Sequence, residues 1–164
     1  MTARLQLLPL DRANPVHLAG LWALWQAAYG QEARLLGLAP ADFPPLARKL
    51  ESLRQDPAPA MGASAAGQWL GAVVYQPGAD AAELAIDALL VAPAWQRRGI
   101  GSALLIGLMR AHPQARLTVS TARANAPALA LYRGLGFEPG PHWEVAQGLV
   151  LLSLSRRPFA EQPC

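Results

Sequence analysis

The sequence is poor in cysteine and histidine, and this shortage excludes several kinds of site. The one cysteine, Cys164, is the last residue. The chain can therefore form neither an internal disulfide nor a cysteine-based metal site, which favours a reducing cytoplasmic location. A catalytic nucleophile is also not expected at a chain end. Three histidines, His17, His112 and His142, lack the spacing of metal ligands, so we predict no metal site.

Charge is scarce as well. Charged residues make up 15% of the 164 residues, and the formal net charge is +3. Lys49 is the only lysine among 14 Lys and Arg residues, which leaves 13 arginines. Those arginines are dispersed, with only Arg97-Arg98 and Arg156-Arg157 adjacent. Because nucleic-acid binding requires a clustered basic patch, we predict no nucleic-acid partner.

Long hydrophobic runs are missing too. The uncharged stretches 13–31 and 57–79 are interrupted by polar residues, prolines or glycines, so neither resembles a membrane span of ~20 apolar residues. The N-terminal apolar run stops at Asp11, too early for a signal peptide. We expect no membrane partner. The hydrophobic content of 52% is enough for a core, and residues 1–164 are predicted to form a single domain.

Periodicity and turn residues predict an alternation of strands and helices. Asn14-Pro15 is typical of a helix start, and Gly30 of its end. Because strands both precede and follow helices, the class is mixed α/β with a partly antiparallel sheet. The predicted strands are 3–10, 60–65, 69–76, 83–91 and 116–120, closing with Phe137 and 149–154; the predicted helices are 15–30, 44–55, 99–111 and 125–135.

One segment, Gln96-Arg-Arg-Gly99-Ile-Gly101-Ser102, lies where a strand gives way to a helix. Glycines allow positive φ, so backbone N–H groups can turn toward a ligand. The helix N-terminus adds unpaired N–H donors and the positive end of its dipole. Arg97 and Arg98 add positive charge. The segment therefore predicts a site for a phosphate or pyrophosphate.

Two common phosphate motifs do not fit this segment. A Walker loop needs Gly-Lys-Ser/Thr, but Gly101 is followed directly by Ser102. The dinucleotide fingerprint needs a third small residue where Leu104 stands. Gln96-x-x-Gly99-x-Gly101 instead resembles the coenzyme A pyrophosphate loop of the GCN5-related N-acetyltransferase (GNAT) family.

A second segment carries the same resemblance independently. A predicted strand is followed by Asn125, a predicted helix, and Tyr132-x-x-x-Gly136-Phe137, which is similar to the later GNAT motif. The two motifs stand in the right order and in the right structural contexts. The resemblance implies a GNAT-type acyl-CoA acyltransferase fold: a mixed, mostly antiparallel central sheet with splayed parallel strands, flanked by helices.

The resemblance also implies how acetyl-CoA is bound. The cosubstrate lies between two splayed parallel strands, here those ending at Val91 and spanning 116–120. Its pantetheine arm pairs with backbone near Leu89–Val91 as an added strand. Asn125 hydrogen-bonds the pantetheine. The implied cofactor-binding residues are Leu89, Leu90, Val91, Gln96, Arg97, Arg98, Gly99, Ile100, Gly101, Ser102, Asn125 and Tyr132.

The implied reaction is direct transfer of an acetyl group to a primary amine. Backbone N–H near Leu90 or Val91 would stabilise the oxyanion, and Tyr132 would act as general acid toward the thiolate. The candidate bases are Glu83 and Asp87, on one face of a regular strand and ~13 Å apart, with Glu83 favoured. A solvated charge with no catalytic role is the alternative for either carboxylate. Tyr132 could also be a core aromatic residue, and Asn125 a plain helix cap.

Other readings stay open at this stage. A non-catalytic acyl-CoA-binding or sensor module would use the same loop, although it would need neither Tyr132 nor a base. Aromatic residues Trp22, Trp25, Tyr29 and Trp69 could line an acceptor pocket or belong to the core. The acceptor is undefined: a small amine, an amino acid, an aminoglycoside and a protein N-terminus all fit. A homodimer is also open.

Overall fold

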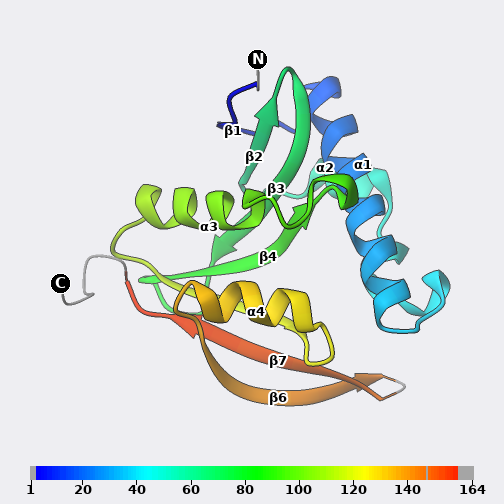
Figure 1. Ribbon diagram of the computed structural model, residues 1–164, viewed down its shortest axis with the longest axis vertical. Coiled ribbons are helices and arrows are strands. Elements are labelled where there is room, and N and C mark those ends of the chain that lie inside the picture. The colour runs from blue at the N-terminus through cyan, green and yellow to red at the C-terminus, as the bar shows by residue number, and fades with distance from the viewer. Residues whose placement is uncertain (1–2, 147, 159–164) are drawn as a thin grey trace. The chain divides into compact units, whose positions relative to one another are not determined.

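The computed structural model describes residues 3–146 and 148–158 (Figure 1), so Cys164 lies outside the described residues. Seven strands form one mixed sheet in the order β1-β2-β3-β4-β5-β7-β6, with helices flanking it. The elements are β1 (Gln6–Pro9), α1 (Pro15–Leu35), η1 (Pro40–Asp42), η2 (Pro44–Ala47), α2 (Leu50–Gln55), β2 (Ala60–Ala65), β3 (Gln68–Pro77), β4 (Glu83–Val91), η3 (Pro93–Trp95), α3 (Ile100–Ala111), β5 (Arg116–Ala122), α4 (Ala126–Gly134), β6 (Glu138–Ala146) and β7 (Leu149–Arg156).

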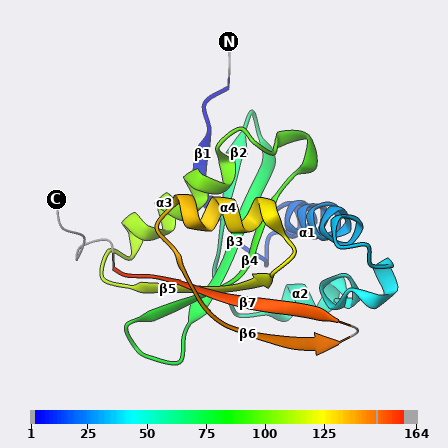
Figure 2. The same ribbon diagram turned by 60° about the horizontal axis from the view of Figure 1, so that its bottom comes forward.

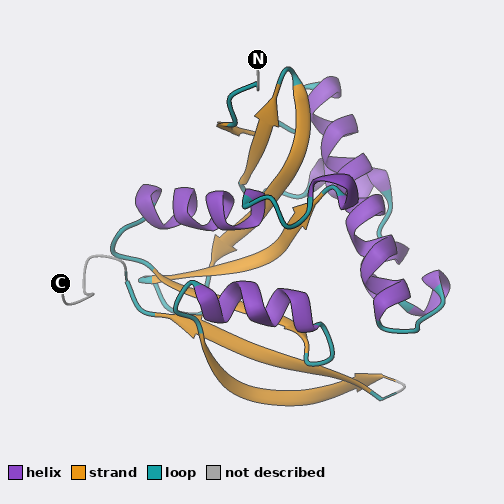
Figure 3. Cartoon of the chain, in the orientation of Figure 1, coloured by secondary structure: helices purple, strands orange, loops and turns teal. Residues whose placement is uncertain are grey.

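The predicted fold class is confirmed. Antiparallel pairing joins β1 to β2, β2 to β3, β5 to β7 and β6 to β7, whereas β4 and β5 pair in parallel. The parallel pairing joins Glu83–Ile86 to Arg116–Val119, after which β4 continues to Val91. Strands β2 and β4 have the predicted bounds, and Figure 3 shows the alternation of strand and helix along the chain.

The chain divides into two compact units. The first comprises Met1–Val74 and Ala88–Leu104, and the second Tyr75–Asp87 and Leu105–Cys164. Strands β3 and β4 and helix α3 each begin in one unit and end in the other.

In the first unit, α1 packs against the sheet through a buried apolar face. Asn14 caps the helix, because its Oδ1 accepts from the Val16 N–H at 2.9 Å. Leu21 and Leu24 are almost fully buried and share a core cluster with Val74 and Leu90. The helix is therefore held mainly by its apolar contacts with β3 and β4.

Aromatic residues considered for an acceptor pocket belong to this core. Trp25 is 5% exposed, and Trp22, Tyr29 and Trp69 pack against the same cluster. Trp69 occupies a slot between two glycines: a Cβ on Gly20 or on Gly62 would lie 2.4 Å from an atom of its ring. Their large apolar surfaces thus stabilise the fold.

The predicted end of α1 at Gly30 is wrong. The helix runs one more turn and ends in a Schellman motif, with Gly37 at φ +68°, its N–H bonded to the Arg34 carbonyl and the Leu38 N–H bonded to the Ala33 carbonyl. Burial of Ala33, which is 1% exposed, favours this extra turn over a stop at Gly30.

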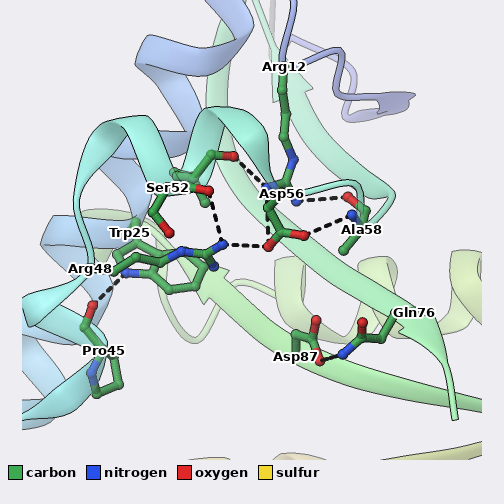
Figure 4. A network of polar contacts seen from close by, with 10 residues as sticks. Arg12, Trp25, Pro45, Arg48, Ser52, Asp56, Ala58, Gln76 and Asp87 are labelled. Atoms are coloured by element: carbon green, nitrogen blue, oxygen red, sulfur yellow. Dashed lines mark hydrogen bonds and ion pairs between the residues drawn. The ribbon is translucent and has the colours of Figure 1, made fainter.

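The single helix predicted over 44–55 is also wrong. The structure has the short 3₁₀ helix η2 and then α2, separated by Arg48 and Lys49 in extended conformations. Tertiary contacts fix this break. Arg48 donates to Asp56 at 2.5 Å and lies over the Trp25 ring, while the buried Arg12 donates to the Leu53 and Ala58 carbonyls (Figure 4).

The second unit contains β5, β7 and β6 side by side, with β7 between the other two (Figure 2). Arg156 on β7 is 6% exposed and donates from Nε to the Leu135 carbonyl at 2.7 Å, the C-cap of α4. A cation at a helix C-terminus satisfies a free carbonyl and complements the dipole. Burial lowers the pKa of Arg156.

The extent of the last two strands differs from the prediction. Strand β6 begins at Glu138, not at Phe137, and continues to Ala146; β7 extends two residues further than predicted, to Arg156. The sequence did not predict β6 because Pro139 and Pro141 are unfavourable within a strand. Prolines are tolerated there because β6 is an edge strand, and its register with β7 shifts between Pro139 and His142.

Candidate active site

The predicted pyrophosphate loop connects β4 to α3 within the first unit (Figure 3). Gly99 has φ +81°, a conformation that suits glycine, and it immediately precedes the first residue of α3, Ile100. Apart from Gly99 itself and its two chain neighbours, no described residue has an atom within 4 Å of the position that a Gly99 Cβ would occupy. The Gly99 carbonyl accepts from the Ala103 N–H at 2.9 Å. The loop thus leaves open space at a helix N-terminus, where backbone N–H groups lack partners within the helix.

Arg97 has φ +60°, which is unusual for a residue with a side chain. Its neighbour Arg98 lies over the Trp95 ring, with the guanidinium carbon 4.9 Å from the ring centre. Both arginines are exposed. Their positive charges stand directly before the first residue of α3 in the chain.

Gln96 begins the loop and has a contact that the sequence did not reveal. Its Nε2 donates to Oε1 of Gln31 on α1 at 2.5 Å, and it lies 3.3 Å from the Val91 carbonyl. Gln31 and Gln96 are 65 residues apart in the chain, so no local pattern could predict this pairing.

The end of β4 provides the backbone of the predicted pantetheine site. Leu90 is fully buried, whereas Leu89 and Val91 are half-buried and lie on the other face of the strand. Gly71 allows β3 to approach this stretch closely, since a Cβ there would lie 2.8 Å from the Leu90 carbonyl oxygen.

Asn125 and Tyr132 lie in the second unit, at the start and near the end of α4. Asn125 is 8% exposed and caps the helix, with Oδ1 accepting from the Ala128 N–H at 3.2 Å. Tyr132 is 4% exposed, and its ring contacts Phe137 edge to face, with ring centres 5.2 Å apart. Both residues therefore have structural roles, whatever they contribute to a reaction.

The two candidate bases lie on β4 in the second unit and differ in environment. Glu83 is half-buried, and its Oε1 accepts from the Thr118 hydroxyl at 3.3 Å. Asp87 is exposed and accepts from Gln76 Nε2 at 3.0 Å (Figure 4). The register of β4 with β5 continues from Glu83 to Ile86 without a shift, so this stretch of β4, which ends directly before Asp87, is regular.

A surface hollow of about 720 Å³ lies elsewhere in the first unit, lined by residues from 47–49, 51–52 and 55–57. None of the predicted site residues lines it. Over residues 3–146 and 148–158, no three His, Cys, Asp or Glu side chains are placed to share a metal ion. In the same part of the chain, no helix has the length and apolar character needed to cross a membrane.

Comparison with known proteins defines the class of protein. The model of the acetyltransferase (GNAT) family matches residues 19–137, which include both motifs. The chain belongs to the GNAT family of acetyltransferases. The family resemblance expected from the two motifs is therefore confirmed.

Solved structures agree at the level of the fold. The ribosomal-protein-S18-alanine N-acetyltransferase from Escherichia coli superposes with a TM-score of 0.72 at 19% identity, over 98% of this chain and 97% of that one. The PaiA N-acetyltransferase from Thermoplasma acidophilum, solved in complex with coenzyme A, gives 0.71 at 15% identity, over 94% and 99%.

A curated relative is similar in sequence over part of its length. UPF0157 protein YqkA of Bacillus subtilis (strain 168) is 31% identical over 125 residues, which is 76% of this chain and 35% of that protein. The chain thus spans about a third of the length of this relative.

Proposed function

We propose that this GNAT acetyltransferase transfers an acetyl group from acetyl-CoA to a primary amine by direct attack. The observation that carries the proposal is the β4–α3 loop, with Gly99 at φ +81° and open space before the first turn of α3. Such a loop suits a pyrophosphate, since it offers backbone donors and a favourable dipole without a steric barrier. The coenzyme A complex of the T. acidophilum neighbour supports the choice of ligand.

Several short segments of the chain bind different parts of the cosubstrate. The loop residues bind the pyrophosphate through backbone N–H groups, assisted by the charges of Arg97 and Arg98 and the Ser102 hydroxyl. Backbone near Leu89–Val91 pairs with the pantetheine arm. The Asn125 side-chain amide donates to the pantetheine, because Oδ1 of the same side chain already accepts from Ala128.

Acetyl-CoA supplies an activated thioester. The Glu83 carboxylate takes a proton from the acceptor ammonium, directly or through water, and the freed amine forms the N–C bond as the C–S bond breaks. The Leu90 or Val91 N–H stabilises charge on the carbonyl oxygen. Tyr132 gives its hydroxyl proton to the departing thiolate and regains one from the acylated nitrogen, and Glu83 releases to solvent the proton that it took from the ammonium, so protons balance. Asp87 is the second candidate for the base.

Substitutions at Glu83 and Tyr132 test these roles. In Tyr132→Phe the ring still contacts Phe137, so only the hydroxyl is lost; kcat should fall ~100-fold or more at every pH. Glu83→Gln should lower kcat mainly at low pH, where the acceptor is an ammonium and needs a base. The measurement is thiol release from acetyl-CoA across a panel of amines. Thr118→Val is a control for the Glu83 contact. Wild-type rates in both variants would contradict the two assignments.

The alternative, a non-catalytic acyl-CoA-binding module, predicts a different result in the same assay. The wild-type protein would bind acetyl-CoA, yet no amine in the panel, including peptides with free N-termini, would release thiol. Thiol release that requires both an amine and Tyr132 would exclude this alternative.

A further inference from the structure

Gln31 on α1 is a hydrogen-bond partner of Gln96, the first residue of the predicted pyrophosphate loop. Its Oε1 accepts from Gln96 Nε2 at 2.5 Å, so the two amides are in direct contact. Gln96 Nε2 also lies 3.3 Å from the Val91 carbonyl, which is the last residue of β4. The Gln96 side chain therefore connects the loop to a helix and to a strand.

The position of Gln31 is fixed by the packing of α1. Two residues earlier, Tyr29 contacts the rings of Trp25 and Phe43, at centroid distances of 4.9 and 5.9 Å. Two residues later, Ala33 is 1% exposed. These packed neighbours hold the helix backbone that carries Gln31, so its side chain extends from a rigid element rather than from a loop.

The loop needs such an anchor because its backbone is strained. Arg97, directly after Gln96, has φ +60°, a conformation that is unfavourable for a residue with a Cβ. Strain of this kind persists only where surrounding contacts hold it. On the far side of Arg97, Arg98 lies over Trp95. On the near side, the Gln96 backbone N–H reaches the Pro93 carbonyl only at 3.4 Å, which leaves the Gln96 side chain as the stronger restraint.

We propose that Gln31 is a positioning residue for the pyrophosphate loop, acting through Gln96. The inference rests on the proposed binding of acetyl-CoA by this loop, and it adds a residue from a helix 65 positions earlier in the chain. Without Gln31 the loop populates its binding conformation for a smaller fraction of the time. The apparent affinity for acetyl-CoA falls in proportion to that fraction, whereas the bound state is unchanged.

The kinetic test uses Gln31→Leu, with Gln26→Leu on the same helix as the matched control. Gln31→Leu should raise KM for acetyl-CoA about three- to tenfold with kcat within about twofold, as expected when the competent fraction falls to roughly a third to a tenth. Gln26→Leu should leave both constants unchanged. A double-mutant cycle with Gln96→Leu should be non-additive, since each substitution removes the same hydrogen bond. Additive effects, or an unchanged KM in Gln31→Leu, would overturn the proposal.

A second readout needs no cosubstrate. Limited trypsin digestion of the ligand-free protein should cut faster after Arg97 and Arg98 in Gln31→Leu, with the cut sites identified by mass spectrometry. Gln31→Glu keeps an oxygen acceptor for Gln96 and should restore the wild-type cleavage rate. Equal cleavage in wild type and Gln31→Leu would contradict the positioning role. If Gln31→Leu is cleaved faster but the wild-type protein does not bind acetyl-CoA, the proposed function is wrong, whereas the contact of Gln31 with Gln96 still positions the loop.

Discussion

Asn125 combines a structural contact with a proposed ligand contact in one side chain. Its Oδ1 caps α4 by accepting from the Ala128 N–H, and the residue is 8% exposed. An asparagine side chain also carries two N–H donors that a serine or aspartate cap lacks. The two roles can therefore be separated by substitutions that keep a cap and remove the amide.

We expect Asn125→Ser and Asn125→Asp to retain the stability of the protein, because both residues are good helix caps. Both should raise the Kd for coenzyme A at least tenfold, since neither can donate an amide N–H to the pantetheine. Asn125→Ala should lose affinity and also about 1 kcal/mol of stability. Calorimetric titration and urea denaturation measure the two effects. Normal coenzyme A binding by Asn125→Ser would show that Asn125 caps α4 and does not bind the pantetheine.

At the scale of elements, ion pairs of Asp56 with Arg12 and Arg48 connect the β1–α1 turn to the segments on either side of α2 (Figure 4). Asp56 lies 3.5 Å from the buried Arg12 and 2.5 Å from Arg48, and its Oδ1 accepts from the Ala58 N–H at 2.9 Å. Burial acts to raise the pKa of Asp56. The hydrogen bonds from Arg48 and Ala58 and the charges of both arginines outweigh it, so the pKa of Asp56 lies below its ordinary value.

This direction fixes how stability should depend on pH. Since the folded-state pKa is the lower one, the stabilisation by Asp56 is fully present above about pH 4 and is lost as pH falls through the folded-state value. Asp56→Asn should cost about 2–3 kcal/mol at pH 7, because it leaves Arg12 with less compensation. The difference from wild type in urea denaturation should shrink below pH 4.

The control for this prediction is Glu51→Gln, which removes an exposed ion pair with Arg54 on α2. Solvent screens such a pair, so the urea midpoint should stay that of the wild type at pH 7. A difference between Asp56→Asn and wild type that persists unchanged down to pH 2 would show that the charge of Asp56 does not stabilise the fold.

At the scale of the whole molecule, binding of the cosubstrate should stabilise the folded state. Acetyl-CoA at about 100 times its Kd adds ~2.7 kcal/mol, which corresponds to a rise in Tm of roughly 5–10 °C for a chain of this size. ATP and NAD should shift Tm much less, because they lack the pantetheine. Differential scanning fluorimetry measures the shift. The absence of any shift with acetyl-CoA or coenzyme A would contradict ligand binding altogether.

Several features at this scale stay predictions. From composition we predict a single domain over residues 1–164, a cytoplasmic location and no nucleic-acid partner. The amine panel addresses the acceptor, and sedimentation of the purified protein would decide between monomer and dimer.

Local patterns were enough to predict much of the fold. The sequence predicts strands β2 and β4 to the residue, because boundary residues such as the Ala66-Gly67 turn, both at positive φ, and Pro93 are short-range signals. The two motifs likewise depend on neighbouring residues. They were sufficient to predict the family and to nominate the loop, Asn125 and Tyr132.

Only the tertiary structure decided the features that depend on distant residues. Burial of Ala33 carries α1 past Gly30, Arg12 and Asp56 hold the break before α2, and an edge position permits prolines in β6. The Gln31–Gln96 contact belongs with these. A sequence pattern records the preferences of adjacent residues, whereas such contacts form only when packing brings separate segments together.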